Sequence, residues 1–224
     1  MPIYTRTKLI KEEYGVGRPT KSIPKMTKLE QREASVEKLF SAARQFFVLK
    51  GYNSTTLEEI ATAVGMTKGS IYFYFGSKEA VLIELLNRAE KIVIEPVLEL
   101  ISNSSKSASD RIVSFLHHQA LLSVTERENM LLIILMSLEF DDGAVRKKIK
   151  SLYRKLYDGL DAVVRSGQEA GEFRTDAPSR EIVSIIIANH DGTLLEWYRR
   201  NDELDGAKLV KAMRDIIIFG LKKE

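Results

Sequence analysis

The chain of 224 residues contains no cysteine, which excludes disulfide bridges and thiolate metal sites. No stretch reaches the roughly 18 consecutive apolar residues that a membrane-spanning helix requires. The N-terminus also lacks the apolar core of a signal peptide. We therefore expect a cytoplasmic protein with no membrane partner.

Histidine is scarce as well, with only His117, His118 and His190. None of them follows a glutamate by three residues, so the Glu-x-x-His pairs of a di-iron helical bundle are absent. Neighbouring residues on a helix diverge by about 100°, which makes the pair at 117–118 a poor metal site. The sequence also shows no nucleophile–base pair and no glycine-rich phosphate loop. We expect no metal, no cofactor and no catalytic residues.

Strand-like alternation, internal repeats and low-complexity tracts are also missing. Hydrophobic residues make up 44% and charged residues 29% of the chain, as in ordinary globular proteins. The apolar spacing predicts an all-α protein. The predicted helices cover residues 36–50, 56–64, 67–74, 77–102, 109–124, 127–138, 142–170, 179–200 and 206–222. Pro96 predicts a kink or break in the fourth helix.

The predicted helix at 67–74 has features of a DNA-reading helix. Its first residues are short, flexible or polar: Thr67, Lys68, Gly69 and Ser70. A helix that enters the major groove contacts DNA with its N-terminal residues. Glycine costs such a helix about 0.5–1 kcal/mol relative to alanine, and close approach of the backbone to DNA is one reason to keep it.

Three adjacent aromatic residues follow in the same helix. Ile71 and Phe75 are four residues apart and are expected to face the core, which leaves Tyr72, Phe73 and Tyr74 at or near the surface. Phenolic hydroxyls can donate to phosphate, and a phenyl edge can contact a thymine methyl group. Packing of Tyr72 in the core is the alternative.

Two further residues begin helices beside this segment. Thr56 and Lys78 lie where free backbone amides favour an anion, so we expect them to form a phosphate clamp. The alternatives are that Thr56, like Thr67, only caps its helix, and that Lys78 is a solvated surface charge.

Residues 36–86 resemble the N-terminal DNA-binding domain of the tetracycline-repressor (TetR) family of bacterial regulators. The match covers less than a quarter of the chain. It lies in Thr56-Leu57, Ile60-Ala61, Val64-Gly65-Met66, Gly69-Ser70-Ile71-Tyr72-Phe73-Tyr74-Phe75, Ser77-Lys78-Glu79 and Leu82.

The resemblance implies a homodimer joined by its last two helices and bound to a palindromic operator in double-stranded DNA. It also implies DNA contacts. Lys68, Ser70, Tyr72 and Phe73 would face bases or phosphates. Thr56, Tyr74 and Lys78 would hold the DNA backbone, with Tyr74 at a position where many members carry histidine.

Charge and periodicity suggest three parts. Residues 1–32 carry eight lysines and arginines against three glutamates, so we predict a basic, mostly irregular arm that could contact phosphates. Within it, Gly17-Arg18-Pro19 is either a minor-groove arm or a solvated tail. A three-helix helix-turn-helix DNA-binding domain is predicted for 33–78. A larger helical ligand-binding and dimerisation domain is predicted for 79–224.

The predicted body could enclose an apolar cavity with a few polar groups. Asn189 and His190 are polar groups in an otherwise apolar helix and would need partners if buried. Ordinary core packing is the alternative for each candidate. The candidates are His117, Met130, Leu135, Met136, Phe140, Tyr153, Tyr157, Asn189, His190 and Trp197.

The helix over 182–197 is apolar on all sides, which suggests burial by its own core and by a second subunit. We therefore expect a dimeric transcriptional repressor that leaves its operator when a small, largely apolar molecule binds the body. The alternative is a DNA-binding regulator without a ligand, acting constitutively or through a protein partner.

Overall fold

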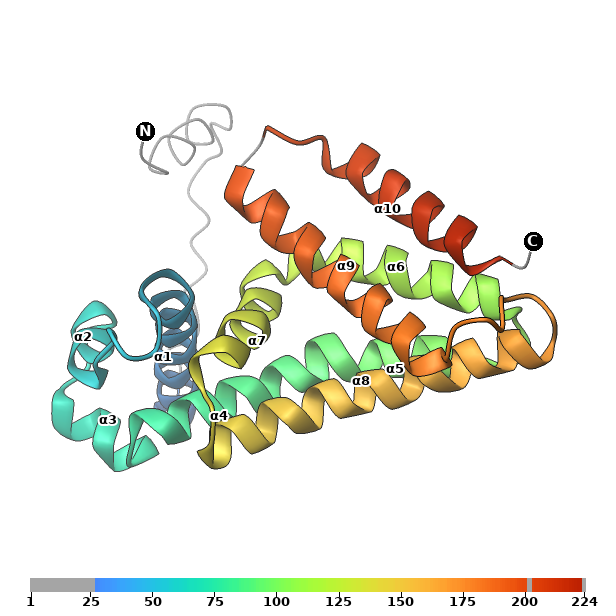
Figure 1. Ribbon diagram of the computed structural model, residues 1–224. Coiled ribbons are helices and arrows are strands. Elements are labelled where there is room, and N and C mark those ends of the chain that lie inside the picture. The colour runs from blue at the N-terminus through green and yellow to red at the C-terminus, as the bar shows by residue number, and fades with distance from the viewer. Residues whose placement is uncertain (1–26, 201–202, 223–224) are drawn as a thin grey trace, which may run out of the picture. The chain divides into compact units, whose positions relative to one another are not determined.

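The computed structural model describes residues 27–200 and 203–222. The chain divides into two units, Met1–Ala34 and Ser35–Glu224. The predicted all-α fold is confirmed, and within the described residues the only β pairing is an isolated bridge between Phe173 and Lys222. The elements are α1 (Lys28–Lys50), α2 (Leu57–Ala63), α3 (Lys68–Phe75), α4 (Lys78–Ala89), the π-helical segment η2 (Glu90–Ile94), α5 (Glu95–Ser102), α6 (Ala108–Thr125), α7 (Arg127–Glu139), α8 (Gly143–Glu169), α9 (Ser179–Arg200) and α10 (Gly206–Leu221) (Figure 1).

Helix α1 begins eight residues before the apolar stripe that predicted it, at Lys28 instead of Val36. Thr27 Oγ1 accepts the Glu30 backbone N–H at 3.2 Å, and the Glu30 carboxylate accepts the Thr27 N–H at 2.7 Å. This reciprocal capping box starts a polar first turn without apolar periodicity. Most of the predicted basic arm, including Gly17-Arg18-Pro19, lies outside the described residues.

The two short helices after α1 are fixed by local signals. Gly51 and Gly65 have φ of +83° and +71°, a left-handed conformation that ends α1 and α2. Thr56 and Glu59 form a capping box at the start of α2. Ile71 of α3 is fully buried and anchors that short helix.

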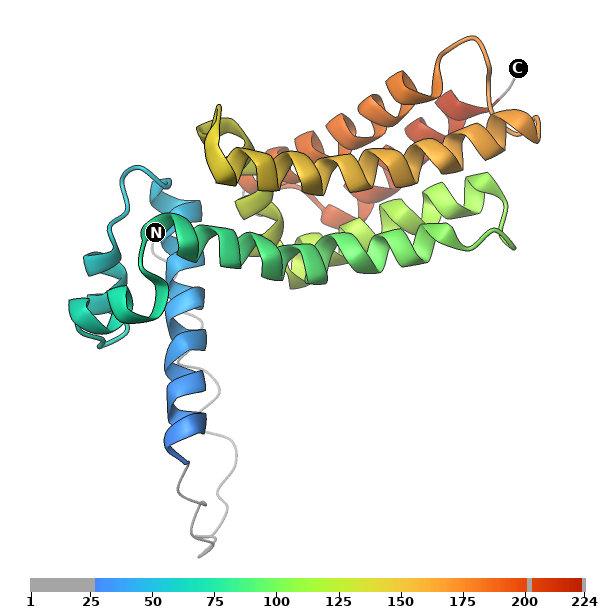
Figure 2. The same ribbon diagram turned by 90° about the horizontal axis from the view of Figure 1, so that it is seen from below.

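The predicted irregularity before Pro96 takes the form of a π-helical turn. The Glu95 N–H donates to Glu90 O, five residues back, and the wider turn continues directly into α5. In Figure 2, α4, η2 and α5 follow one another as a continuous rod beside α8. Within this turn Ile92 is 38% exposed, whereas Val93 and Ile94 are buried.

One apolar cluster extends from the N-terminal helices into the body. It includes Phe47 of α1, Leu85 of α4 and Leu132 of α7, so the core continues across the predicted domain boundary at residue 78. A second cluster, with Phe115 and Leu160, fills the space among α5, α6, α8, α9 and α10. None of the described helices is both long enough and apolar enough to cross a lipid bilayer.

Candidate functional site

Helix α3 presents its aromatic side chains to solvent. Tyr72, Phe73 and Tyr74 are 42%, 82% and 36% exposed, whereas Phe75 turns inward and meets Phe40 edge to face at 5.1 Å. An apolar ring as exposed as Phe73 gains nothing from the protein's own core. The arrangement suits contact with another molecule along the outer side of α3.

The cation and the phenol at the start of α3 are held by one carboxylate. Lys68 Nζ lies 2.5 Å from Glu58 Oε1, and the Tyr72 hydroxyl donates to the same oxygen at 3.3 Å. The hydrogen bond from Lys68 lowers the pKa of Glu58, and its reciprocal effect raises the pKa of Lys68. Glu58 engages one of the three N–H donors of Lys68, and the contact of Lys68 with DNA stays a prediction.

Thr67 and Ser70 complete the start of the helix. Thr67 Oγ1 accepts the Ser70 N–H at 3.2 Å, and the two hydroxyls lie 2.8 Å apart. Gly69 has room for a side chain, because a Cβ there would meet its nearest neighbour, Thr67 Oγ1, at 4.0 Å. Nothing inside the described fold requires glycine here.

Lys78 is directed toward the loop between α1 and α2. Its ammonium donates to Tyr52 O and Thr55 O, both at 2.8 Å, and lies 4.1 Å from the centre of the Tyr52 ring. Burial lowers the pKa of Lys78. Two of its three N–H donors therefore hold the loop. The predicted contact between Lys78 and a phosphate would use the third N–H donor, and it stays a prediction.

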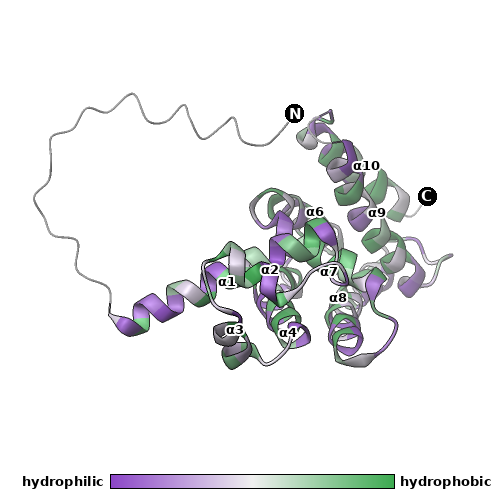
Figure 3. Cartoon of the chain, turned by 90° about the vertical axis from the view of Figure 1, so that its left-hand side faces the viewer, coloured by the Kyte–Doolittle hydropathy of each residue, from purple (hydrophilic) through white to green (hydrophobic). Residues whose placement is uncertain are grey.

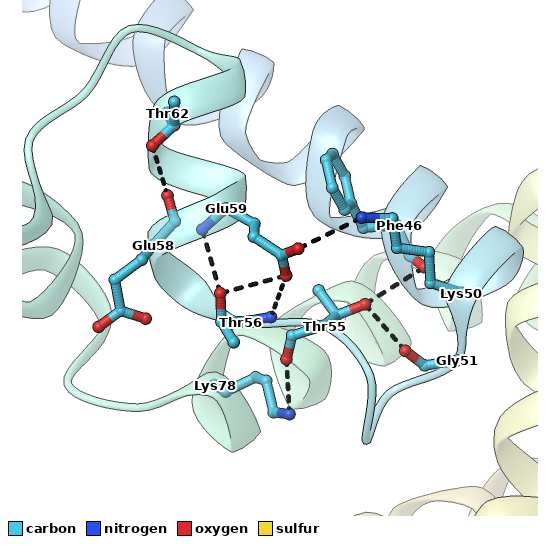
Figure 4. Close-up of polar contacts among 9 residues, drawn as sticks. All are labelled: Phe46, Lys50, Gly51, Thr55, Thr56, Glu58, Glu59, Thr62 and Lys78. Atoms are coloured by element: carbon cyan, nitrogen blue, oxygen red, sulfur yellow. Dashed lines mark hydrogen bonds and ion pairs between the residues drawn. The ribbon is translucent and has the colours of Figure 1, made fainter.

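The same loop is closed by its own side chains (Figure 4). Thr55 is fully buried, and its hydroxyl donates to Gly51 O at 2.8 Å. Thr56 Oγ1 accepts the Glu59 N–H at 3.2 Å, and Glu59 Oε2 accepts the Thr56 N–H at 2.9 Å. Thr56 therefore caps α2, and its predicted contact with DNA stays a prediction.

The end of α7 holds this loop from the other side. Glu139 Oε2 accepts the Tyr52 N–H at 2.9 Å, and the ring of Phe140 packs 4.8 Å from the ring of Tyr52. Sequence reasoning missed Tyr52 and Glu139, because nothing local links positions so far apart. Phe140, a candidate for the ligand cavity, lies here instead.

A cavity of about 450 Å³ lies among α6, α9 and α10. Its lining includes three of the candidate ligand residues, His117, His190 and Trp197. The rest of its lining is mostly apolar or uncharged: Ala120, Ser123, Val124, Thr193, Leu194, Gly206, Ala207, Leu209, Val210 and Met213, with Lys211 and Arg214 as the charged members. Its size is in the range of small-molecule sites.

Tyr153 and Tyr157 lie apart from that cavity, in a groove of about 830 Å³ between α8 and α9. The Tyr153 hydroxyl donates to Asp191 Oδ2 at 3.0 Å, and His190 Nδ1 lies 2.9 Å from Asp191 Oδ1. Burial, followed by the Asp191 charge, strongly raises the pKa of Tyr153. Tyr153 therefore stays neutral and acts as a hydrogen-bond donor.

The remaining candidates lie elsewhere. Met136 is fully buried in the core and lines neither space, and Leu135 packs partly buried against the same core. Met130 borders an internal void of about 30 Å³. Asn189 is exposed on α9, where its amide donates to Ile185 O at 3.0 Å.

The face that carries Asn189 is apolar and open. Ile185 of α9 and Ile216 and Phe219 of α10 are 60%, 70% and 83% exposed. In Figure 3 both helices carry hydrophobic segments. This face is available for a partner surface.

Comparison with known proteins identifies both halves of the chain. The family model described as "Bacterial regulatory proteins, tetR family" matches residues 39–85. The model described as "Tetracyclin repressor-like, C-terminal domain" matches residues 105–221.

Individual relatives extend over most of the chain. The crystal structure of the MbdR regulator from Azoarcus sp. CIB is 41% identical, with a TM-score of 0.77 over 84% of this chain and 100% of that one. The fatty acid metabolism regulator protein of Bacillus subtilis (strain 168) is 22% identical over 86% of this chain and 98% of its own length. The structure of FadR from Bacillus subtilis in complex with stearoyl-CoA is 20% identical and shares the fold, with a TM-score of 0.69 over 83% and 99% of the two chains.

Proposed function

Because the chain belongs to the TetR family of bacterial transcriptional regulators, we propose that it is a repressor released from a palindromic operator by a small, largely apolar molecule. The family consists of DNA-binding regulators that are not enzymes, and the same holds for this chain. The proposal has five parts: the repressor role, the operator, the homodimer, the effector and a place in the cytoplasm.

Operator recognition is assigned to α3. Its exposed face combines Lys68 for phosphate with Tyr72 and Phe73 for base edges and thymine methyl groups. Gly69 allows the backbone to approach, and Ser70 and Tyr74 add hydroxyl groups. This exposed polar and aromatic face is the observation on which the proposal chiefly depends.

Dimerisation is assigned to the open apolar face of α9 and α10. Burial of Ile185, Ile216 and Phe219 against a second copy would remove these side chains from water. A twofold axis through this face would present two α3 helices to one side of a DNA duplex. They must lie about 34–36 Å apart to reach successive major grooves.

The effector is assigned to the cavity among α6, α9 and α10. One structural relative, FadR from Bacillus subtilis, was solved in complex with stearoyl-CoA, a molecule with a long apolar part. Met130 of α7 borders the internal void beside the cavity residue His190, and Glu139 at the end of α7 holds the loop before α2. A shift of α7 on binding would therefore reach the DNA-binding helices. By linkage, effector and operator would weaken each other equally.

The test begins with selection of an operator from random duplex DNA, followed by a screen for small molecules that release it. Ala120→Trp places an indole in the cavity, so effector affinity should fall at least tenfold while operator affinity stays within twofold. Ala144→Trp is the control, because Ala144 is exposed and lies outside the cavity. Failure to select any duplex would refute DNA recognition, and an unchanged response in Ala120→Trp would refute this effector site.

A further inference from the structure

A row of cations lies along the groove between α8 and α9. Arg146, Lys150 and Arg154 are four residues apart, so they share one side of α8 and span about 12 Å of helix. Arg180, in the first turn of α9, also lines the groove. Four positive side chains thus border one open space.

These cations are poorly neutralised by the protein. Lys150, Arg154 and Arg180 make no ion pair within residues 27–200 and 203–222. Arg146 is half-buried. Its guanidinium donates to Ser137 O at 2.9 Å, while its Nε is buried without a hydrogen-bond partner in the described fold.

Three carboxylates also border the groove, but two of them are engaged. Asp161 pairs with Arg165 at 2.8 Å and accepts the Ser179 hydroxyl. Asp191 accepts the Tyr153 hydroxyl and contacts His190. Arg165 neutralises Asp161. Asp158 and Asp191 keep their charges and offset two of the four cations, so the groove has an excess of positive charge that attracts an anion.

The groove meets the interior of the body at Tyr153 and Asp191, which line both the groove and the internal void of about 30 Å³. Two polar atoms at that void, Gln119 Oε1 and His190 Nε2, are buried without hydrogen-bond partners in the described fold. His190 in turn lines the apolar cavity among α6, α9 and α10. A polar groove, two buried polar atoms without partners in the described fold and an apolar cavity therefore follow one another across the body.

We propose that the effector is an amphiphile with a phosphate-bearing head, which binds the cations of the α8–α9 groove, and an acyl or aryl part that enters the body past Tyr153. This inference rests on the proposed function and changes one part of it, because the molecule that the body senses carries a charged head in addition to its apolar part. Arg146, Lys150, Arg154 and Arg180 hold the phosphates. The unpartnered Gln119 Oε1 and His190 Nε2 form hydrogen bonds with the polar group that joins the head to the tail.

Binding is measured by calorimetry on the full-length protein with coenzyme A esters of acetate, benzoate, octanoate and palmitate as probes. Three further probes separate the contributions to binding. Free coenzyme A lacks the tail, and the free acids lack the phosphate-bearing head. Lysophosphatidic acid carries its phosphate on a lipid instead of a nucleotide. We expect one or more esters to bind at least tenfold more tightly than the matching acid. Tighter binding of lysophosphatidic acid than of any ester would assign the groove to a lipid phosphate instead of a nucleotide head.

The double variant Lys150→Glu/Arg154→Glu tests the groove itself. It should weaken the best phosphate-bearing ligand at least tenfold and leave operator affinity without effector unchanged. Lys147→Glu is the control, because Lys147 is exposed on α8 but lies outside the groove.

The inference is overturned if no phosphate-bearing probe binds below millimolar concentration, if the free acids bind as tightly, or if the double variant binds like the control. Each result leaves operator binding measurable, so failure of the groove is distinguishable from failure of the repressor proposal.

Discussion

The segment proposed to read DNA and the body proposed to bind an effector differ in how their functional residues are distributed along the chain. Those of the reading segment lie within residues 56–78, and those of the cavity extend from His117 to Arg214. A short segment whose own caps and turns fix its side chains can be recognised in sequence. A cavity assembled from three distant helices cannot. The difference also predicts that a substitution at an exposed position of one region should leave the function of the other intact.

The largest effect is expected for Tyr72→Ala. Loss of the proposed contact between this side chain and DNA should reduce operator affinity roughly ten- to hundredfold. The melting temperature should stay constant, because the side chain is partly exposed. Fluorescence anisotropy and thermal denaturation measure the two quantities. Tyr72→Phe keeps the ring and shows how much of the effect belongs to the hydroxyl. Wild-type affinity in Tyr72→Ala would remove α3 from the recognition surface.

Glu90→Gln should destabilise the fold of the body. Glu90, on η2, is 8% exposed and accepts hydrogen bonds from Lys148 and Lys155 of α8. Its removal leaves two ammonium groups without their counterion, and the free energy of unfolding should fall by about 2 kcal/mol at pH 7. Urea denaturation measures this difference.

The same substitution has a defined pH dependence. Burial alone raises the pKa of Glu90, but the hydrogen bonds and charges of Lys148 and Lys155 outweigh burial and lower it. Its contribution to stability is therefore complete above the ordinary glutamate pKa of 4.5 and is lost as the pH falls through the lowered value. A wild-type advantage that persisted at the lowest pH would contradict this account.

Glu139→Ala tests the connection between the regions. Loss of the charged acceptor for the Tyr52 N–H should lower the free energy of unfolding by about 1.5 kcal/mol, or roughly 3–6 °C in melting temperature. The effector should also release the variant less well, so the operator affinity without effector divided by that with effector should be smaller than in the wild type. Glu169→Ala, at an exposed site on α8, is the control. A full effector response in Glu139→Ala would place the coupling elsewhere.

The smallest effect on stability, and one of opposite sign, is expected for Gly69→Ala. Alanine favours a helix over glycine by about 0.5–1 kcal/mol, and the site has room for the methyl group. The fold should become slightly more stable while operator affinity falls, because the methyl group separates the backbone from DNA. Stability and affinity that rise together would show that glycine has no role in recognition.

Helix positions were readable in the sequence because capping residues, glycine ends and apolar spacing act over a few residues. Gly51, Thr56, Gly65 and Ser77 set their helix boundaries within one or two residues of the prediction. The start of α1 was missed because its capping box at Thr27 precedes a turn without apolar periodicity.

The sequence by itself determined the helices and the exposed aromatic residues of α3, since local hydrogen bonds and helix periodicity depend on neighbouring residues. Its resemblance to the TetR family implied a DNA-binding regulator. Tertiary structure decided which long-range partners each side chain found. It directed Lys78 to the Tyr52 loop, placed Phe140 beside that loop instead of in a cavity, and separated Tyr153 from Trp197. Those outcomes depend on how distant helices pack, and no short stretch of sequence carries that information.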